Sequence, residues 1–333
     1  MLSTAKSYAF REQKLCFWKI IVFFFFILWR ICIFALMKRL PLYTLLMVCA
    51  LLLTSCGGSS YKEKVALRKE QTKVQQRLEQ KALKIGITPT IDCLPVLVAQ
   101  QEGYLVGMPD SFRIRLMPLA IEIDQALVQG KLNVGVSDVK RLERANAKQQ
   151  QLLSLGKTNL YWLLVASKSS RIKEPRQLGD KLVGMTRFSA LDYLTDRVLA
   201  DHPTKEAVYK IQVNDPMLRL EMLHNSAVDA LWLPEPQITA ARLAGYPVLA
   251  DSRKYEQQLA LFVTRAADLK QSTRSAQLQQ FVEAYNRAAD LLNKQGWSAY
   301  APLMKEQFKI TDAAFEKLPK FTFTHLTVRP DAQ

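Results

Sequence analysis

The chain has 333 residues, of which 49% are apolar, so it is long enough to form one large or two modest folded domains. Its 46 basic and 30 acidic residues give a net charge of +16, but they form no arginine-rich or aromatic-interleaved patch typical of nucleic-acid binding, and we expect no nucleic-acid partner. The three histidines are scattered and the five cysteines lack metal-type spacing, so we expect neither a metal site nor a cofactor.

The first apolar segment covers residues 15–36, about the length that a membrane-spanning helix needs. Lys19 and Arg30 interrupt it, and a complete export signal follows it. We therefore interpret residues 1–36 as an upstream extension of the reading frame, with translation starting at Met37. The alternative is a genuine N-terminal membrane helix.

Residues 37–55 have the layout of a cleaved export signal, with two basic residues, a short apolar stretch and two small residues before Cys56. The ending Leu53-Thr54-Ser55-Cys56 resembles the bacterial lipobox, in which the cysteine is diacylated and becomes the mature N-terminus. We predict lipidation of Cys56 and a location in the cell envelope, facing the periplasm and anchored to a membrane. The mature chain would carry 39 basic and 29 acidic residues, a net charge of +10, and Cys93 as its only other thiol.

Residues 56–82 connect this anchor to the folded part of the protein. The stretch Tyr61–Lys81 is charged, rich in glutamine and poor in apolar residues. This composition is typical of a flexible or loosely helical spacer. We expect the folded domain to begin at Leu83.

From Leu83 onwards, strand-like and helix-like segments alternate. The expected strands are short and rich in apolar residues, at 83–87, 112–119, 132–136, 152–156, 161–167, 181–185, 209–213, 229–233, 246–250 and 258–265. The expected helices are 94–102, 123–128, 140–150, 191–199, 217–223, 237–243 and 275–294. Strands that alternate with helices indicate βαβ units and a mostly parallel sheet, and two such series indicate two sheets.

The sequence therefore predicts an α/β fold with two lobes, each a mostly parallel sheet flanked by helices. We assign residues 83–166 to the first lobe and residues 167–260 to the second. Residues 261–333 would return to the first lobe and add the C-terminal helices. The two crossovers, expected near 163–170 and 259–264, would serve as a hinge for lobe closure.

Three segments of the chain resemble the type II periplasmic binding proteins, and most closely the branch that binds nitrate, sulfonates, taurine and thiamine-precursor pyrimidines. These segments are KIGITPTIDCLPVLVAQQEGYL, ALVQGKLNVGVSD and DALWLPEPQITAARLAG, in this order. The ordered set carries the resemblance, since no single motif is very specific. Asn133, where an acid is common, and the proline before Glu235 depart from the pattern of the branch.

The resemblance implies a monomeric, lipid-anchored solute-binding protein, not an enzyme, that captures a small polar organic molecule. It would deliver this molecule to the permease and ATPase subunits of an ABC importer. One alternative is a ligand sensor or adaptor lipoprotein without a transport role. Another is an enzyme on the same fold, such as a pyrimidine-synthesising relative, but that class would need a His/Cys-rich site and a cofactor lysine, and the site inventory does not provide them.

Polar residues follow the strands at the points where helices begin. Ligands of open α/β sheets bind in the crevice beyond the carboxyl ends of the strands. We therefore select as candidate ligand-binding residues the polar, charged and aromatic side chains at these strand ends, which are Thr88, Thr90, Asp92, Ser137, Asp138, Arg187, Phe188, Ser189, Asn214 and Glu235.

Each candidate also has a structural interpretation, because Ser, Thr, Asn and Asp cap helices wherever helices begin. The helix that starts at Ser189 would offer free N–H groups to an anion, and Arg187 would add a charge-assisted bond. A nitrogen group of the ligand would face Asp92, Asp138 or Glu235. We therefore predict a ligand with an anionic group, with or without an amine or a nitrogen ring.

Aromatic residues and the remaining thiol allow two interpretations each. Phe188, Tyr161 and Trp162 are either stacking surfaces for the ligand or core residues. Cys93 precedes the apolar run Leu94–Ala99, so we expect it to be a structural residue.

Overall fold

The computed structural model of this protein describes residues 61–105, 112–256 and 258–328. The predicted export signal, Cys56 and residues 1–36 lie outside the described residues, so export and lipidation stay predictions. The chain divides into two compact units, Met1–Thr72 and Lys73–Gln333, and both lobes belong to the second. In the part of the chain that the structure describes, no helix is both long and apolar enough to cross a membrane.

The expected spacer is one continuous helix, α3 (Tyr61–Lys81), because its many Glu, Lys, Gln and Arg residues favour helix and no Gly or Pro interrupts them. Its last carbonyl groups are satisfied by Arg274, which donates to the carbonyl oxygens of Lys81 at 2.7 Å and Gln80 at 2.6 Å. Glu79 forms an ion pair with Arg115 at 2.8 Å. These contacts fix the last turn of α3 on the folded domain that follows it.

The first lobe is a five-stranded sheet with the order β2-β1-β3-β10-β4. Its strands are β1 (Leu83–Ile87), β2 (Phe112–Leu116), β3 (Val134–Asp138), β4 (Leu152–Lys157) and β10 (Ala260–Arg265). β1 pairs in parallel with β2 and β3, whereas β10 pairs antiparallel with β3 and β4. Four strands therefore run in one direction, and only the returning strand β10 opposes them.

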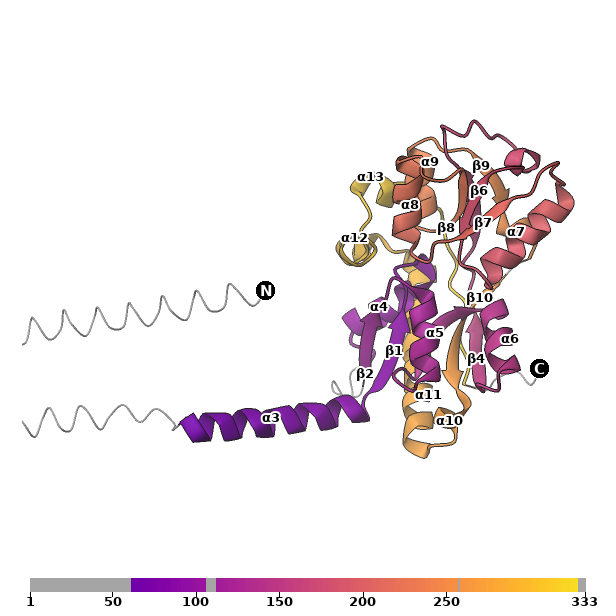
Figure 1. The fold of residues 1–333 in the computed structure, drawn as a ribbon. Helices are drawn as coiled ribbons and strands as arrows, with labels where there is room; N and C mark the ends of the chain where they lie inside the picture. The colour runs from indigo at the N-terminus through magenta and orange to yellow at the C-terminus, as the bar shows by residue number, and fades with distance from the viewer. Residues whose placement is uncertain (1–60, 106–111, 257, 329–333) are drawn as a thin grey trace, which may run out of the picture. The chain divides into compact units, whose positions relative to one another are not determined.

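Helices cover the first sheet (Figure 1): η1 (Ile91–Cys93), α4 (Leu94–Gln101), α5 (Ala120–Val128), α6 (Val139–Ala147), α10 (Ala266–Leu269) and α11 (Ser272–Gln295). α5 packs against β1, β3 and β10, and α11 packs against α4 and β1. The close approach of α5 requires glycine in the strands, because a Cβ atom at Gly135 would collide with Ile123 of α5.

The second lobe repeats this arrangement with the strand order β7-β6-β8-β5-β9. Its strands are β5 (Trp162–Ala166), β6 (Leu182–Met185), β7 (Tyr209–Gln212), β8 (Ala230–Pro234) and β9 (Val248–Asp251). The helices of this part are η2 (Pro175–Leu178), α7 (Ala190–Asp201), α8 (Pro216–His224), α9 (Gln237–Leu243) and η3 (Ser252–Lys254). The predicted two-lobed fold with mostly parallel sheets is confirmed.

The structure moves the expected lobe boundaries. Trp162–Ala166, which the sequence analysis assigned to the first lobe, is β5 and pairs with β8 and β9 in the second sheet. The crossovers are therefore residues 158–161 and 252–259 rather than 163–170 and 259–264. Periodicity shows that a segment is a strand, but it does not show which of two sheets will accept that strand.

The C-terminal part does not lie wholly on the first lobe. After η4 (Ser298–Tyr300) and α12 (Ala301–Phe308), α13 (Asp312–Glu316) packs against α9 of the second lobe. The chain then returns as an extended segment, residues 319–328, beside β4, where the amide of Thr327 donates to the Leu155 carbonyl oxygen at 2.7 Å.

Candidate functional site

A pocket that is partly open to solvent lies between the two lobes, and its empty space, counted together with the open solvent at its mouth, is about 580 Å³. Residues at the carboxyl ends of β1, β3, β6, β7 and β8 line it, which is the position where open α/β sheets bind ligands. Seven of the ten candidates from the sequence analysis line this pocket, namely Thr88, Thr90, Asp92, Ser137, Asp138, Ser189 and Asn214. Among the described residues, no group of His, Cys, Asp and Glu side chains could hold a metal ion.

Asp92 brings a buried carboxylate to the first-lobe side of the pocket, in the 3₁₀ turn η1 after β1, with 3% of its surface exposed. Its oxygens accept hydrogen bonds from the Thr90 hydroxyl at 2.6 Å and the Thr158 hydroxyl at 3.0 Å. Burial raises the pKa of Asp92, and these hydroxyl groups lower it in part. No ion pair to Asp92 occurs within the described residues, so neutral groups, chiefly these two hydroxyls, stabilise this carboxylate.

Arg219 brings a buried guanidinium group to the second-lobe side, and the sequence analysis missed it. It is 2% exposed and donates to the carbonyl oxygens of Val213 at 2.7 Å and Trp232 at 3.0 Å. Its third bond goes to the Thr186 hydroxyl at 2.7 Å. Burial lowers the pKa of Arg219 to about 9, although Asp215 raises it in part.

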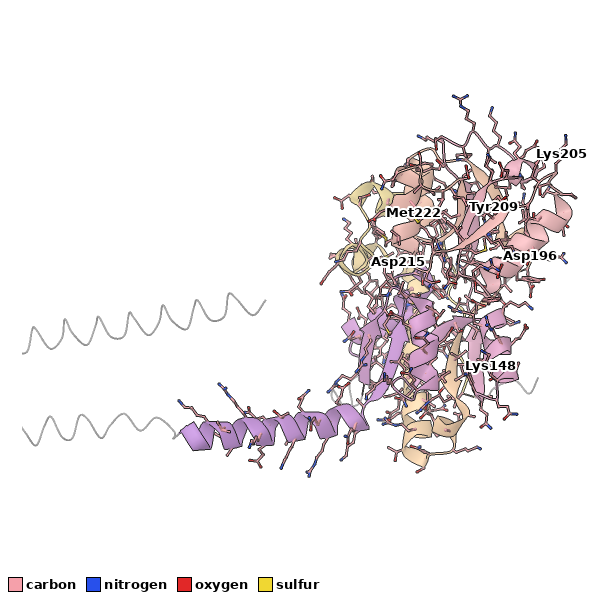
Figure 2. The ribbon with its side chains drawn as sticks, in the orientation of Figure 1. Lys148, Asp196, Lys205, Tyr209, Asp215 and Met222 are labelled. Carbon is pink, nitrogen blue, oxygen red and sulfur yellow. The ribbon has the colours of Figure 1, made fainter. Side chains whose placement is uncertain are left out.

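The position of Arg219 follows from α8, which begins at the carboxyl end of β7. Figure 2 shows Asp215, the cap of α8, at the end of the helix nearer the first lobe, with Met222 farther from it. Arg219 lies one turn after this cap. In the sequence, an arginine within an amphipathic helix is typical of the solvent side. The feature of the sequence that could have identified Arg219 is its place near the start of a helix that follows a strand end.

Asp138 joins the two lobes. Its carboxylate accepts from the amide of Arg141 at 3.0 Å, which caps α6, and from the amide of Ala190 at 2.9 Å, which begins α7 in the other lobe. The Arg141 side chain balances its charge, since Nε lies 2.9 Å from Asp138 and 3.2 Å from Asp124. The N-terminus of α7, where the sequence analysis placed the anionic group of the ligand, therefore holds a carboxylate of the chain itself.

Two pairs of a cation with an aromatic ring lie between the same two helices, α6 and α7. The guanidinium carbon of Arg144 on α6 is 4.1 Å from the centre of the Phe188 ring. The Lys140 amine, on the same helix, is 4.8 Å from the ring centre of Tyr193 on α7. Cation–π contacts thus flank the Asp138 bridge along the α6–α7 boundary.

Arg187 and Phe188, both candidate ligand residues, do not line the pocket. Arg187 Nε lies 3.2 Å from Asp192 Oδ2, and Nη1 donates to the Lys210 carbonyl oxygen at 3.2 Å. The Phe188 side chain is 58% exposed and stacks with Arg144. Both side chains serve contacts around the start of α7 instead of facing the pocket.

Glu235 is also absent from the pocket lining. Its side chain is fully buried and accepts from the Tyr161 hydroxyl at 3.0 Å and from the amide and hydroxyl of Thr239 at 3.1 and 2.8 Å. Burial raises the pKa of Glu235, and the Thr239 and Tyr161 hydroxyl groups lower it in part. The carboxylate therefore holds the start of α9 and fixes Tyr161. Of the other aromatic candidates, Trp162 does line the pocket.

The pocket can hold a polar molecule, and the Cys93 thiol does not line it. Cys93 is fully buried, and burial raises the pKa of its thiol well above the usual value. Asn214 contributes a buried amide oxygen that has no hydrogen-bond partner in the described structure. A donor on a bound molecule would satisfy this oxygen.

Comparison with solved structures identifies the fold. The alkanesulfonate-binding protein SsuA from Xanthomonas axonopodis pv. citri, bound to MOPS, superposes with a TM-score of 0.62 at 18% identity, over 71% of this chain and 82% of its own. The periplasmic aliphatic sulphonate-binding protein SsuA from Escherichia coli gives 0.59 at 19% identity, over 71% and 81%. The periplasmic nitrate-binding protein NrtA from Synechocystis PCC 6803 gives 0.61 at 14% identity, over 73% and 71%. The fold is that of the periplasmic binding proteins, as the sequence resemblance predicted.

Sequence comparison leads to the same group. No curated protein matches the chain. A family model described as NMT1/THI5 like matches residues 90–295, more than half of the chain. This match includes the second lobe, all of the first lobe's sheet except β1, and most of the pocket lining. The chain therefore belongs to the NMT1/THI5-like family.

Proposed function

We propose that this protein is an extracytoplasmic solute-binding protein that captures a small polar organic molecule between its lobes and delivers it to an ABC importer. The observation that carries the proposal is the pocket itself, which two lobes joined by two crossovers form from their strand ends. Lobes joined in this way close on a ligand by hinge motion. The neighbours named as sulfonate- and nitrate-binding proteins support the same role.

The proposal includes a lipid anchor at Cys56. The sequence Leu53-Thr54-Ser55-Cys56 at the end of an export signal supports it. Each buried methylene of an acyl chain contributes about 0.8 kcal/mol, so two or three chains hold a soluble domain at a membrane. The protein would then act as a monomer beside the permease and ATPase subunits.

Two measurements test the transport role. Mass spectrometry of protein purified from its native host and then denatured identifies the molecule that the pocket releases. Uptake of that molecule, labelled with an isotope, is then followed in cells with and without the gene. We expect uptake to fall in the deletion strain and to return with the wild-type gene. Equal uptake in both strains would contradict a transport role and favour the sensor alternative.

A further inference from the structure

Two side chains of opposite charge line the pocket and form no ion pair within the described part of the chain. One is Asp92, from the first lobe, whose oxygens accept hydrogen bonds from the hydroxyls of Thr90 and Thr158. The other is Arg219, from the second lobe, which contacts two carbonyl oxygens and a hydroxyl. Both are almost fully buried, at 3% and 2% exposure.

The second acidic residue at the pocket, Asp138, differs from Asp92. Asp138 forms an ion pair with Arg141, and it accepts the amide of Ala190. Its charge is therefore compensated within the protein. The carboxylate also fills the N-terminus of α7, so a second anion from the ligand would meet like charge there.

A buried charge is costly unless an opposite charge and hydrogen bonds compensate it. The chain leaves this compensation incomplete at Asp92 and at Arg219, and the space between them is the pocket. Three hydrogen bonds from Arg219 leave two of its five N–H donors for a ligand. The unpartnered oxygen of Asn214 adds an acceptor beside it.

We propose that the solute is a zwitterion, whose nitrogen cation binds Asp92 and whose carboxylate or sulfonate binds Arg219. This inference rests on the proposed solute-binding function and specifies its substrate class. An inorganic anion or a simple alkanesulfonate would satisfy Arg219 and leave Asp92 without a cation. A simple amine would do the reverse. Only a molecule that carries both groups compensates both side chains at once.

Calorimetry with matched pairs of probes tests this assignment. Each ω-amino sulfonate or ω-amino carboxylate, with two to five methylene groups, is compared with the same acid without the amine. We expect at least one zwitterion to bind more than about tenfold more tightly than its matched acid, because it gains a buried charge pair. No binding by any probe, or equal binding within every pair, would overturn the zwitterion assignment.

Two variants locate the charges. Asp92→Asn should weaken binding of the zwitterion by more than about tenfold and leave binding of the matched acid unchanged. Asp268→Asn, which alters a buried acid whose partners Asn133 and Arg265 also lie outside the pocket lining, serves as the control and should preserve the preference. Arg219 also bonds to two backbone carbonyl oxygens, so the milder variant Arg219→Lys is used and its melting temperature is measured to check folding. Arg219→Lys should weaken the binding of both probes. An unchanged preference in Asp92→Asn would overturn the assignment.

Failure of the zwitterion assignment can be distinguished from failure of the proposed solute-binding function. A protein that binds simple acids as tightly as zwitterions would still be a solute-binding protein, but with an anionic substrate. A native protein that releases no small molecule on denaturation would contradict the proposed function itself.

Discussion

Replacing Asp138 should open the two lobes. Its carboxylate accepts the amide of Ala190 across the lobe boundary at 2.9 Å and is 5% exposed. A hydrogen bond to a charged group contributes about 1.5–3 kcal/mol. Since about 1.4 kcal/mol corresponds to a factor of ten, Asp138→Ala should lower the ratio of closed to open molecules by about ten- to hundredfold. The same substitution also removes the cap of α6, which should lower the stability of the first lobe by about 1 kcal/mol without acting on closure directly.

Two further variants separate closure from capping. Asp138→Asn keeps an oxygen that can accept both amides and removes the charge, so its effect should be intermediate. Thr311→Ala removes the cap of α13, where the threonine hydroxyl accepts the amide of Ala314 at 3.2 Å within one segment. This control should lower stability by about 1 kcal/mol without opening the lobes.

Fluorescence energy transfer between labelled cysteines at positions 148 and 205 reports the closure. Figure 2 shows Lys148 at the end of α6 in the first lobe and Lys205 in the second lobe, and both side chains are exposed. Cys93 is buried and should not take label. We expect lower transfer in Asp138→Ala than in the wild type or in Thr311→Ala. Equal transfer in all three ligand-free proteins would refute the role of Asp138 as a contact that closes the lobes.

The other contacts of the structure lead to four further predictions, and the sequence at Cys56 leads to a fifth. Glu235→Ala should lower the free energy of unfolding by about 2–4 kcal/mol in chemical denaturation, because it removes three hydrogen bonds to a buried carboxylate. Arg187→Ala should leave solute affinity within about threefold in calorimetry, because Arg187 does not line the pocket. The Cys93 thiol should react slowly with thiol reagents, because it is buried and its pKa is raised; fast labelling that the solute blocks would disprove this. Burial raises the pKa of Asp92 above 3.8, so the folded state binds the carboxyl proton more tightly than the unfolded state does. The free energy of unfolding should therefore fall as pH rises from 3.8 through the raised pKa. In unfolding measured across this pH range, Asp92→Asn should lose less stability than the wild type. Cys56→Ala should abolish acylation, and an N-terminal peptide of the wild-type protein without acyl mass would contradict the anchor.

Much of the fold could be predicted from local patterns. The helix 237–243 has the bounds expected from its sequence, and the two sheets match the two predicted series of strands alternating with helices. The assignment of β5 to the second sheet could not be predicted. Its residues, Trp162–Ala166, are apolar and fully buried, and a buried strand carries no mark of the sheet that will accept it.

The candidate site likewise contains residues that local patterns predict and residues that they do not. Thr88, Asp92, Ser137 and Asn214 line the pocket because strand ends meet at one edge of each sheet, a rule that needs only the sequence. Arg187 and Glu235 follow strands in the same way, but distant residues contact them. The Lys210 carbonyl oxygen takes one bond from Arg187, and Glu235 holds Tyr161, 74 positions away in the chain. The partners of a charged side chain depend on tertiary packing.

Native mass spectrometry of the protein from its own host tests the central claim, that a solute binds between the lobes. The wild-type protein should carry one small molecule that denaturation releases. Asn214→Trp should lose it, because the indole would fill the pocket that Asn214 lines. Asn225→Trp, which adds the same bulk at the exposed C-terminal end of α8, should retain it. The same molecule on both variants, or none on the wild type, would contradict binding at this pocket.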